Sequence, residues 1–186
     1  MNYSDEQLIA NYLKGDEKML EILIQRYLKA IYGFVYRYIN SSQEAEDITQ
    51  EVFMRAWRNF KGFNPQKGNF KTWIFTIAKN ASLDFIKKKK TTPFSEFDNE
   101  EGENILTETL ADPAPSPSEI LERADNKQKV NSIVENLPVQ YQMLLFLYYN
   151  DHFNFREIAE ILGEPLNTIK SRHRRSLVML KKLLSG

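Results

Sequence analysis

The sequence lacks cysteine altogether and has only two histidines, His152 and His173, among its 186 residues. The absence of cysteine excludes disulfides, thiolate metal sites and cysteine nucleophiles. There is also no Gly-rich loop of the kind that holds phosphates. Little therefore remains from which a catalytic or metal centre could be built. We predict that the chain is not an enzyme, has no catalytic residues and needs neither a metal nor a cofactor.

Long apolar runs are missing as well, since none approaches the ~18 residues of a membrane span. The first ten residues, MNYSDEQLIA, lack the basic start and apolar core of a secretory signal. These two absences predict a cytoplasmic protein. Apolar residues make up 42% of the chain, which is enough to bury a core in one large or two small domains.

The net charge is zero, but the charges are segregated along the chain. Residues 61–90 contain eight basic and one acidic side chain, and residues 165–186 contain six basic and none that is acidic. Between them, residues 91–127 contain ten acidic and two basic side chains. Two separated basic blocks suggest two contacts with one polyanion, because Lys and Arg supply most nucleic-acid affinity. Two ordinary solvated helix faces would carry the same charge.

Helical periodicity covers most of the chain and predicts an all-α fold. Apolar residues recur at spacings of three and four up to residue 90, and capping boxes are expected at Ser4 and Ser41. Residues 91–117 are acidic and contain several prolines, which predicts a flexible linker. Helical signals then return, with a buried helix expected at 143–149. We therefore predict two small helical domains, at 1–90 and 118–186.

Residues 154–175 predict a helix-turn-helix. Asn154 suits a helix cap, and Gly163 can end the first helix with positive φ before a second one begins near Leu166. At 100° per residue the second helix has one apolar side, on which His173 lies as a boundary residue. Its other side is short, polar and basic, as a reader of the DNA major groove requires. The candidate DNA contacts are Asn167, Thr168, Lys170, Ser171, Arg172, Arg174 and Arg175.

Three motifs in register resemble the sigma-70 family of bacterial RNA polymerase sigma factors, specifically its extracytoplasmic-function (ECF) group. They are AEDITQEVFMRAW at 45–57, WIFTIAKN at 73–80, and EIAEILG at 157–163 followed by NTIKSR. The resemblance covers about residues 5–90 and 120–184. It implies a transcription initiation factor that directs core RNA polymerase to specific promoters and assists strand opening. Residues 1–90 would be the family's region 2 and residues 118–186 its region 4.

The resemblance also implies roles for particular residues. The 45–57 helix would dock on the coiled coil of the polymerase β′ subunit through Asp47, Gln50, Glu51 and Phe53. The loop at 61–71 and the helix after it would bind and melt the minus-ten element. Its candidate contacts are Lys61, Phe63, Asn64, Lys67, Asn69, Lys71, Lys79 and Asn80. The outer face of the 167–175 helix would read the minus-thirty-five element.

The implied partners are core RNA polymerase, through its β′ and β subunits, promoter DNA, and an anti-sigma factor of a kind that can be membrane-bound. Some positions depart from the family pattern. Lys79 replaces an Arg and loses its two-pronged hydrogen bonding, Asn167 stands where Gly is common, and His173 and Arg174 stand where apolar or aromatic residues are frequent. The alternative is a helix-turn-helix regulator that acts without being a polymerase subunit. It predicts duplex binding by the free protein and a ligand cavity within residues 1–90.

Overall fold

The computed structural model describes residues 3–91 and 133–185, so the predicted linker lies outside the described residues from position 92 onward. Every regular element in the described part is helical, which confirms the predicted fold class. The elements are α1 (Asp5–Leu13), α2 (Lys18–Ile39), α3 (Ser42–Arg58), the short 3-10 helix η1 (Phe60–Gly62), α4 (Phe70–Thr91), α7 (Val139–Leu145), the π-helical turn η2 (Phe146–Asn150), α8 (Phe155–Leu162) and α9 (Leu166–Ser185).

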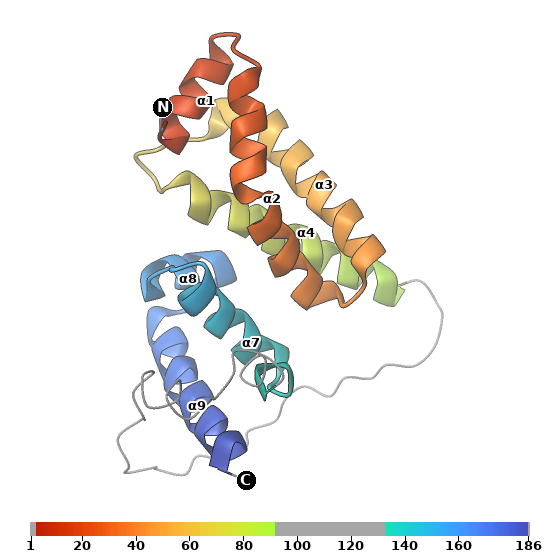
Figure 1. Ribbon diagram of the computed structural model, residues 1–186, viewed down its shortest axis with the longest axis vertical. Coiled ribbons are helices and arrows are strands. Elements are labelled where there is room, and N and C mark those ends of the chain that lie inside the picture. The colour runs from red at the N-terminus through yellow and green to blue at the C-terminus, as the bar shows by residue number, and fades with distance from the viewer. Residues whose placement is uncertain (1–2, 92–132, 186) are drawn as a thin grey trace.

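The first domain is a bundle in which α1, α3 and α4 all pack against the long helix α2 (Figure 1). Apolar residues on α2 point into this bundle, and Ile31, Phe34 and Val35 have no solvent exposure. The facing helices contribute Val52 from α3 and Ile74 from α4, both fully buried. The spacing by three and four, read from the sequence, predicted most of these buried residues, but Leu28 in the α2 series is 47% exposed.

Two capping boxes were predicted in this domain, and only one forms. The Ser4 side chain accepts a hydrogen bond from the Gln7 backbone N–H, and the Gln7 side-chain oxygen accepts one from the Ser4 backbone N–H, so α1 is capped as expected. Ser41 stands at the start of α3 but makes no capping hydrogen bond, so that prediction was wrong. Glu44 instead accepts a hydrogen bond from Lys89 at 2.9 Å. A contact with the end of α4 has replaced a local one.

The second domain contains α7, η2, α8 and α9. The helix predicted at 143–149 is interrupted, because the chain widens into the π-helical turn η2 at Phe146. Met143, Leu144 and Leu147 are buried as expected, whereas Tyr148 and Tyr149 are half-buried. The predicted continuous buried helix is therefore only partly correct.

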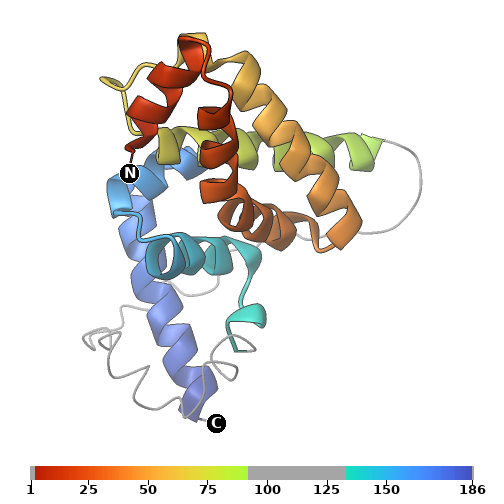
Figure 2. The ribbon, with the colours of Figure 1, turned by 45° about the horizontal axis from the view of Figure 1, so that its top comes forward.

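The two domains pack against each other within the described residues. Helix α8 lies against α4, and α7 lies against α2, as both ribbon views show (Figures 1 and 2). Phe153, in the loop before α8, is 2% exposed and meets the ring of Phe75 edge-on at 4.9 Å between centroids. One hydrophobic cluster therefore runs through both domains.

Candidate nucleic-acid and protein interfaces

Helix α3 presents a polar face that points away from the bundle. Its opposite face is buried at Ala45, Ile48 and Val52. The residues predicted to dock on a protein partner divide accordingly. Asp47, Gln50 and Glu51 are exposed, whereas Phe53 is half-buried and packs against the core.

The carboxylates of Glu51 and Asp47 on this face differ in whether they have a side-chain partner. Glu51 accepts a hydrogen bond from Arg55 at 2.8 Å, and Arg55 also reaches Asp84 on α4 at 3.3 Å. Because these ion pairs lie on the surface, they add little stability but keep the side chains extended. Asp47 has no side-chain partner in the part of the chain that the structure describes, so it can meet a basic group on another protein.

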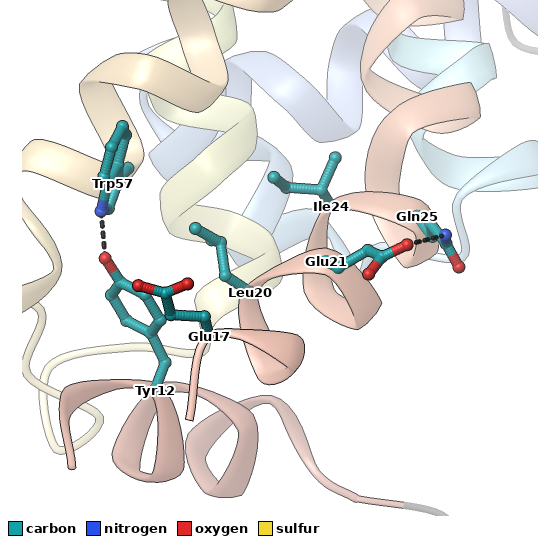
Figure 3. A pocket seen from close by; sticks show the side chains of 7 residues that line it. All are labelled: Tyr12, Glu17, Leu20, Glu21, Ile24, Gln25 and Trp57. Carbon is teal, nitrogen blue, oxygen red and sulfur yellow. Dashed lines mark hydrogen bonds between the residues drawn. The ribbon is translucent and has the colours of Figure 1, made fainter. Parts of the chain in front are cut away.

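The exposed face of α3 also contains two large apolar side chains that the sequence pattern did not single out as surface residues. Met54 is 42% exposed and Trp57 is 52% exposed. The indole nitrogen of Trp57 donates a hydrogen bond to the hydroxyl of Tyr12 on α1 (Figure 3). Trp57 follows Met54 by three residues, on a side of the helix away from Val52 and Ala56. That spacing is the sequence signal that could have revealed the exposure of both side chains.

A groove open to solvent lies beside Trp57, between α1 and α2. Leu20 and Ile24 form its apolar wall, and Glu17 and Glu21 stand at its edge (Figure 3). Gln25 completes the edge and donates a hydrogen bond to Glu21 at 3.2 Å. The groove is acidic at its rim and apolar inside, and it continues from the α3 face.

The loop between η1 and α4 combines an aromatic cluster with exposed basic and amide groups. The Phe63 ring packs on Phe70 at 5.6 Å and on Trp73 at 5.3 Å between centroids. Phe70 is buried at 1% exposure and so belongs to the core. Trp73 is half-buried. The cluster fixes the loop at its base, while Lys61, Asn64 and Lys67 remain exposed.

The remaining minus-ten candidates lie on or just before α4. Asn80 is exposed, whereas Lys71 and Lys79 are half-buried. Asn69 caps the helix, because its side-chain oxygen accepts a hydrogen bond from the Thr72 backbone at 2.7 Å. The eight candidates thus occupy one connected stretch, but their exposure differs.

Three of these candidates face the second domain. The amide nitrogen of Asn69 donates a hydrogen bond to Glu157 at 2.8 Å. Lys71 donates to the backbone carbonyl of Asp151, and its ammonium lies 4.3 Å from the centre of the Phe153 ring. A methyl group added at Gly163 would lie 3.6 Å from the Lys79 ammonium.

The predicted helix-turn-helix is present and closely follows the sequence signals. The Asn154 side chain accepts hydrogen bonds from the Arg156 and Glu157 backbones, and the Glu157 carboxylate accepts one from the Asn154 backbone N–H, so α8 begins with a complete capping box. Gly163 ends α8 with φ 70°, in the left-handed region that glycine adopts without steric cost. Helix α9 begins at Leu166, after a short turn.

Helix α9 buries Ile169, Leu177 and Leu180 and turns a basic face outward. Most of the predicted minus-thirty-five contacts are exposed: Asn167, Lys170, Ser171, Arg174 and Arg175. Thr168 is half-buried. Ser171 donates to the Thr168 carbonyl, and Arg175 donates to the Ser171 hydroxyl at 3.3 Å.

Arg172 differs from its neighbours because it is held by an ion pair. Its two terminal nitrogens contact both oxygens of Glu164, at 2.8 and 2.6 Å, and its side chain is only 12% exposed. A forked pair of this kind fixes both side chains in one geometry. Arg172 therefore ties the turn of the motif to α9 in this structure.

His173 lies where the helix meets the domain core, as predicted. Its Nε2 is 3.1 Å from the Tyr149 hydroxyl, and its ring contacts Tyr148 and Phe155. Burial lowers the pKa of His173 and so favours its neutral ring. Within residues 3–91 and 133–185, no group of three metal-binding side chains gathers. No helix of that part is apolar and long enough to span a membrane.

An exposed acidic and aromatic helix face, a basic loop before a basic helix, and a helix-turn-helix together define a DNA-binding protein that also offers a surface to another protein. Models of two protein families match the chain: Sigma-70 region 2 at residues 23–92 and Sigma-70 region 4 at residues 127–180.

Curated relatives match over almost the whole length. The chain is 32% identical to the ECF RNA polymerase sigma factor SigW of Bacillus subtilis, over 92% of this chain and 91% of that protein. It is 29% identical to the ECF RNA polymerase sigma-E factor of Escherichia coli K12, over 91% and 88% of the two chains.

Two solved structures share the fold. One is CnrH in complex with the cytosolic domain of CnrY, with a TM-score of 0.64 at 20% identity over 97% of each chain. The other is the sigma factor RpoE in complex with the anti-sigma factor NepR from Bartonella quintana, with a TM-score of 0.62 at 22% identity over 89% and 96% of the chains.

The chain belongs to the ECF group of the sigma-70 family. It is a sigma factor, which binds core RNA polymerase and promoter DNA and directs promoter-specific initiation of transcription. This outcome decides against the alternative of a regulator that acts without polymerase. Proteins of this family are generally not enzymes.

Proposed function

We propose that the exposed face of α3 is the surface with which this sigma factor docks on core polymerase. Asp47 and Glu51 offer carboxylates to basic groups of the β′ coiled coil, and Gln50 and Phe53 complete the predicted set. The exposed Met54 and Trp57 extend it with apolar area. Carboxylates around an exposed aromatic residue are typical of protein interfaces, where the aromatic group supplies most of the affinity.

We further propose that the loop at 61–69 and helix α4 bind the minus-ten element as its strands separate. Lys61 and Lys67 would hold phosphates, while Asn64 and Asn80 would bond to exposed base edges. Phe63 would position this loop through its aromatic cluster. The exposure of the loop on a fixed aromatic base supports this proposal.

Helix α9 is proposed to read the minus-thirty-five element in the major groove. Arg174 and Arg175 are the strongest candidates for base or phosphate contacts, with Lys170, Ser171 and Asn167 beside them. Arg172 would need to leave Glu164 in order to contact DNA, so we propose that it orients the turn. The chain is proposed to act in the cytoplasm without catalytic chemistry or a cofactor. An anti-sigma factor is a further proposed partner, because a protein of the same fold was solved in complex with one.

The observation that carries the docking proposal is the exposed, acidic and aromatic face of α3. Run-off transcription with core polymerase and a promoter library tests it. Charge reversal by Asp47→Lys and Glu51→Lys should reduce transcript yield and polymerase binding in parallel, while the circular dichroism spectrum stays unchanged. Each reversal is also made singly, and Glu6→Lys, at an exposed position on α1, is the control matched to each single variant. Polymerase affinity equal to that of the control would exclude the α3 face as the docking surface.

A further inference from the structure

The groove between α1 and α2 is joined to the exposed face of α3 by one residue, Trp57. The indole ring of Trp57, which is 52% exposed, forms one side of the groove, and Glu21 and Gln25 stand on the other (Figure 3). The carboxylates proposed to meet core polymerase belong to the same helix as this ring. A partner that lies on α3 and covers Trp57 therefore reaches the entrance of the groove.

Trp57 is held in an orientation that leaves its ring exposed. Its indole nitrogen donates a hydrogen bond to the Tyr12 hydroxyl, and the Tyr12 ring meets the buried Phe60 edge-on at 5.7 Å between centroids. An exposed aromatic side chain that is already restrained loses little conformational entropy when a partner covers it. Tryptophan is also enriched among the residues that contribute most to the affinity of protein interfaces.

The ionisable groups of the groove carry negative charge. Glu17 and Glu21 are exposed at its edge, and the seven described residues that line it include no Lys or Arg. Within the described part of the chain neither carboxylate has an ion-pair partner, and Glu21 accepts its hydrogen bond from the neutral Gln25 amide. The two glutamates are four residues apart, so their charges repel each other. A positive group bound beside them would relieve that repulsion.

An arginine side chain fits this combination of groups better than a lysine side chain. Its guanidinium is planar, so it can stack on the exposed Trp57 ring while its N–H groups reach a carboxylate. Its methylene groups would lie along Leu20 and Ile24, which form the apolar wall. A lysine ammonium is more strongly hydrated and has no flat face to stack on the ring.

We propose that this groove binds an arginine side chain of core RNA polymerase, through the ring of Trp57 and the carboxylates of Glu17 and Glu21. Polymerase is the occupant because a sigma factor binds it and because the groove opens beside the face of α3. The inference rests on the proposed docking through α3. It adds a second contact on α1 and α2, whose charge and shape select the partner side chain.

Competition with labelled wild-type protein for core polymerase measures the contribution of each group. Glu17→Gln and Glu21→Gln should each weaken binding about threefold and make it less dependent on salt, because each removes one charge and keeps the shape of the side chain. Glu6→Gln, at an exposed position on α1 outside the groove, is the matched control and should change neither. Trp57→Leu should weaken binding roughly tenfold, whereas Trp57→Phe, which keeps an aromatic ring, should retain most of the affinity.

A cross-link identifies the occupant. Because the chain contains no cysteine, Gln25→Cys can carry a benzophenone group at the edge of the groove and at no other position. Irradiated holoenzyme should yield a cross-link to a polymerase peptide that contains an arginine. Replacing that arginine by Ala should weaken the binding of the wild type and have less effect on the binding of Glu21→Gln, since the two groups would act together.

Unchanged polymerase affinity in Trp57→Leu and in both glutamate variants would overturn the proposal. Equal affinities of Trp57→Leu and Trp57→Phe would also overturn it, because the contact would then be apolar and not one with a cation. A dimer of the free protein that Trp57→Leu abolishes would assign the groove to a second copy of the chain instead.

Asp47→Lys in the same assay tests the α3 face alone. If only Asp47→Lys weakens binding, the docking role of α3 stands and the inference about the groove is wrong. If only the groove variants weaken binding, the groove stands as a polymerase contact and the proposed role of the α3 carboxylates is wrong.

Discussion

Asp151 makes the free energy of unfolding of the protein depend on pH in a predictable direction. Its side chain is 9% exposed, and one of its carboxylate oxygens is buried without a hydrogen-bond partner. Burial raises the pKa of Asp151 from 3.8 to about 6, against the opposing effect of Lys71, Arg37 and His152. Its place at the C-terminal end of η2 also disfavours the charged form.

The native protein therefore keeps a proton on Asp151 that the unfolded chain has already released between about pH 4 and pH 6. Because the unfolded state binds fewer protons in that window, the free energy of unfolding falls as pH rises through it. The shift corresponds to roughly 3 kcal/mol when it is complete. Asp151→Asn removes the ionisation, so we expect the variant to match the wild type near pH 4 and to exceed it by up to about 3 kcal/mol at pH 8.

Urea unfolding at a series of pH values measures this difference directly. The difference in the free energy of unfolding between wild type and variant should grow with pH and should not be the same at every pH. Glu46→Gln, at an exposed carboxylate on α3, is the control for a simple change of net charge. Parallel curves for wild type and Asp151→Asn between pH 4 and pH 8 would refute the reasoning.

Three further outcomes are expected. Replacing Arg174 and Arg175 by Ala should weaken holoenzyme binding to the upstream promoter element, by about 1–3 kcal/mol for each side chain that bonds to a base edge. It should flatten the salt dependence of binding for each side chain that bonds to a phosphate. Filter binding at several salt concentrations would contradict us if both the affinity and its salt dependence stayed unchanged. Gly163→Ala should destabilise the protein by about 1–2 kcal/mol, because its φ of 70° is strained for any side chain. Gly62→Ala is the control, since its φ is not in that region and an added methyl meets no atom within 4 Å. The control should not lower the thermal midpoint of unfolding as Gly163→Ala does. Neutralising the five acidic residues between 96 and 103 should tighten non-specific duplex binding by the free protein with a steeper salt slope, if the acidic segment shields the basic surfaces; an unchanged slope would leave it as a passive connection.

Local signals predicted much of the fold because each depends on a few neighbouring residues. Asn154 with Glu157, and Gly163 six residues later, specify the start and end of α8 without help from the rest of the chain. The apolar spacing on α9 likewise placed Ile169 inward and Arg174 outward. Family motifs then supplied the functional class, which no single helix could have given.

The interactions that the sequence did not predict join residues far apart along the chain. Glu44 was expected to cap α3 and instead meets Lys89, 45 positions away. Lys71 was expected to contact DNA, and its donation to the Asp151 carbonyl, 80 positions away, was not foreseen. A sequence pattern gives the face on which a residue lies, but not which other domain covers that face. Trp57 shows the converse case, since an apolar residue at a helix end lies outside the core.

The π-helical turn at Phe146–Asn150 determines how the chain that follows it is rotated relative to helix α7. Its backbone bond runs from the Asp151 N–H to the Phe146 carbonyl, one residue further than in an α-helix. Removing one residue would restore an α-helical turn and rotate all that follows by about 100° relative to α7. Phe146 could then face Arg37, or Phe153 could face Phe75, but these two contacts with the first domain could no longer form together. A single extra residue in this turn thus acts as a spacer that lets the chain on both sides of it reach the first domain.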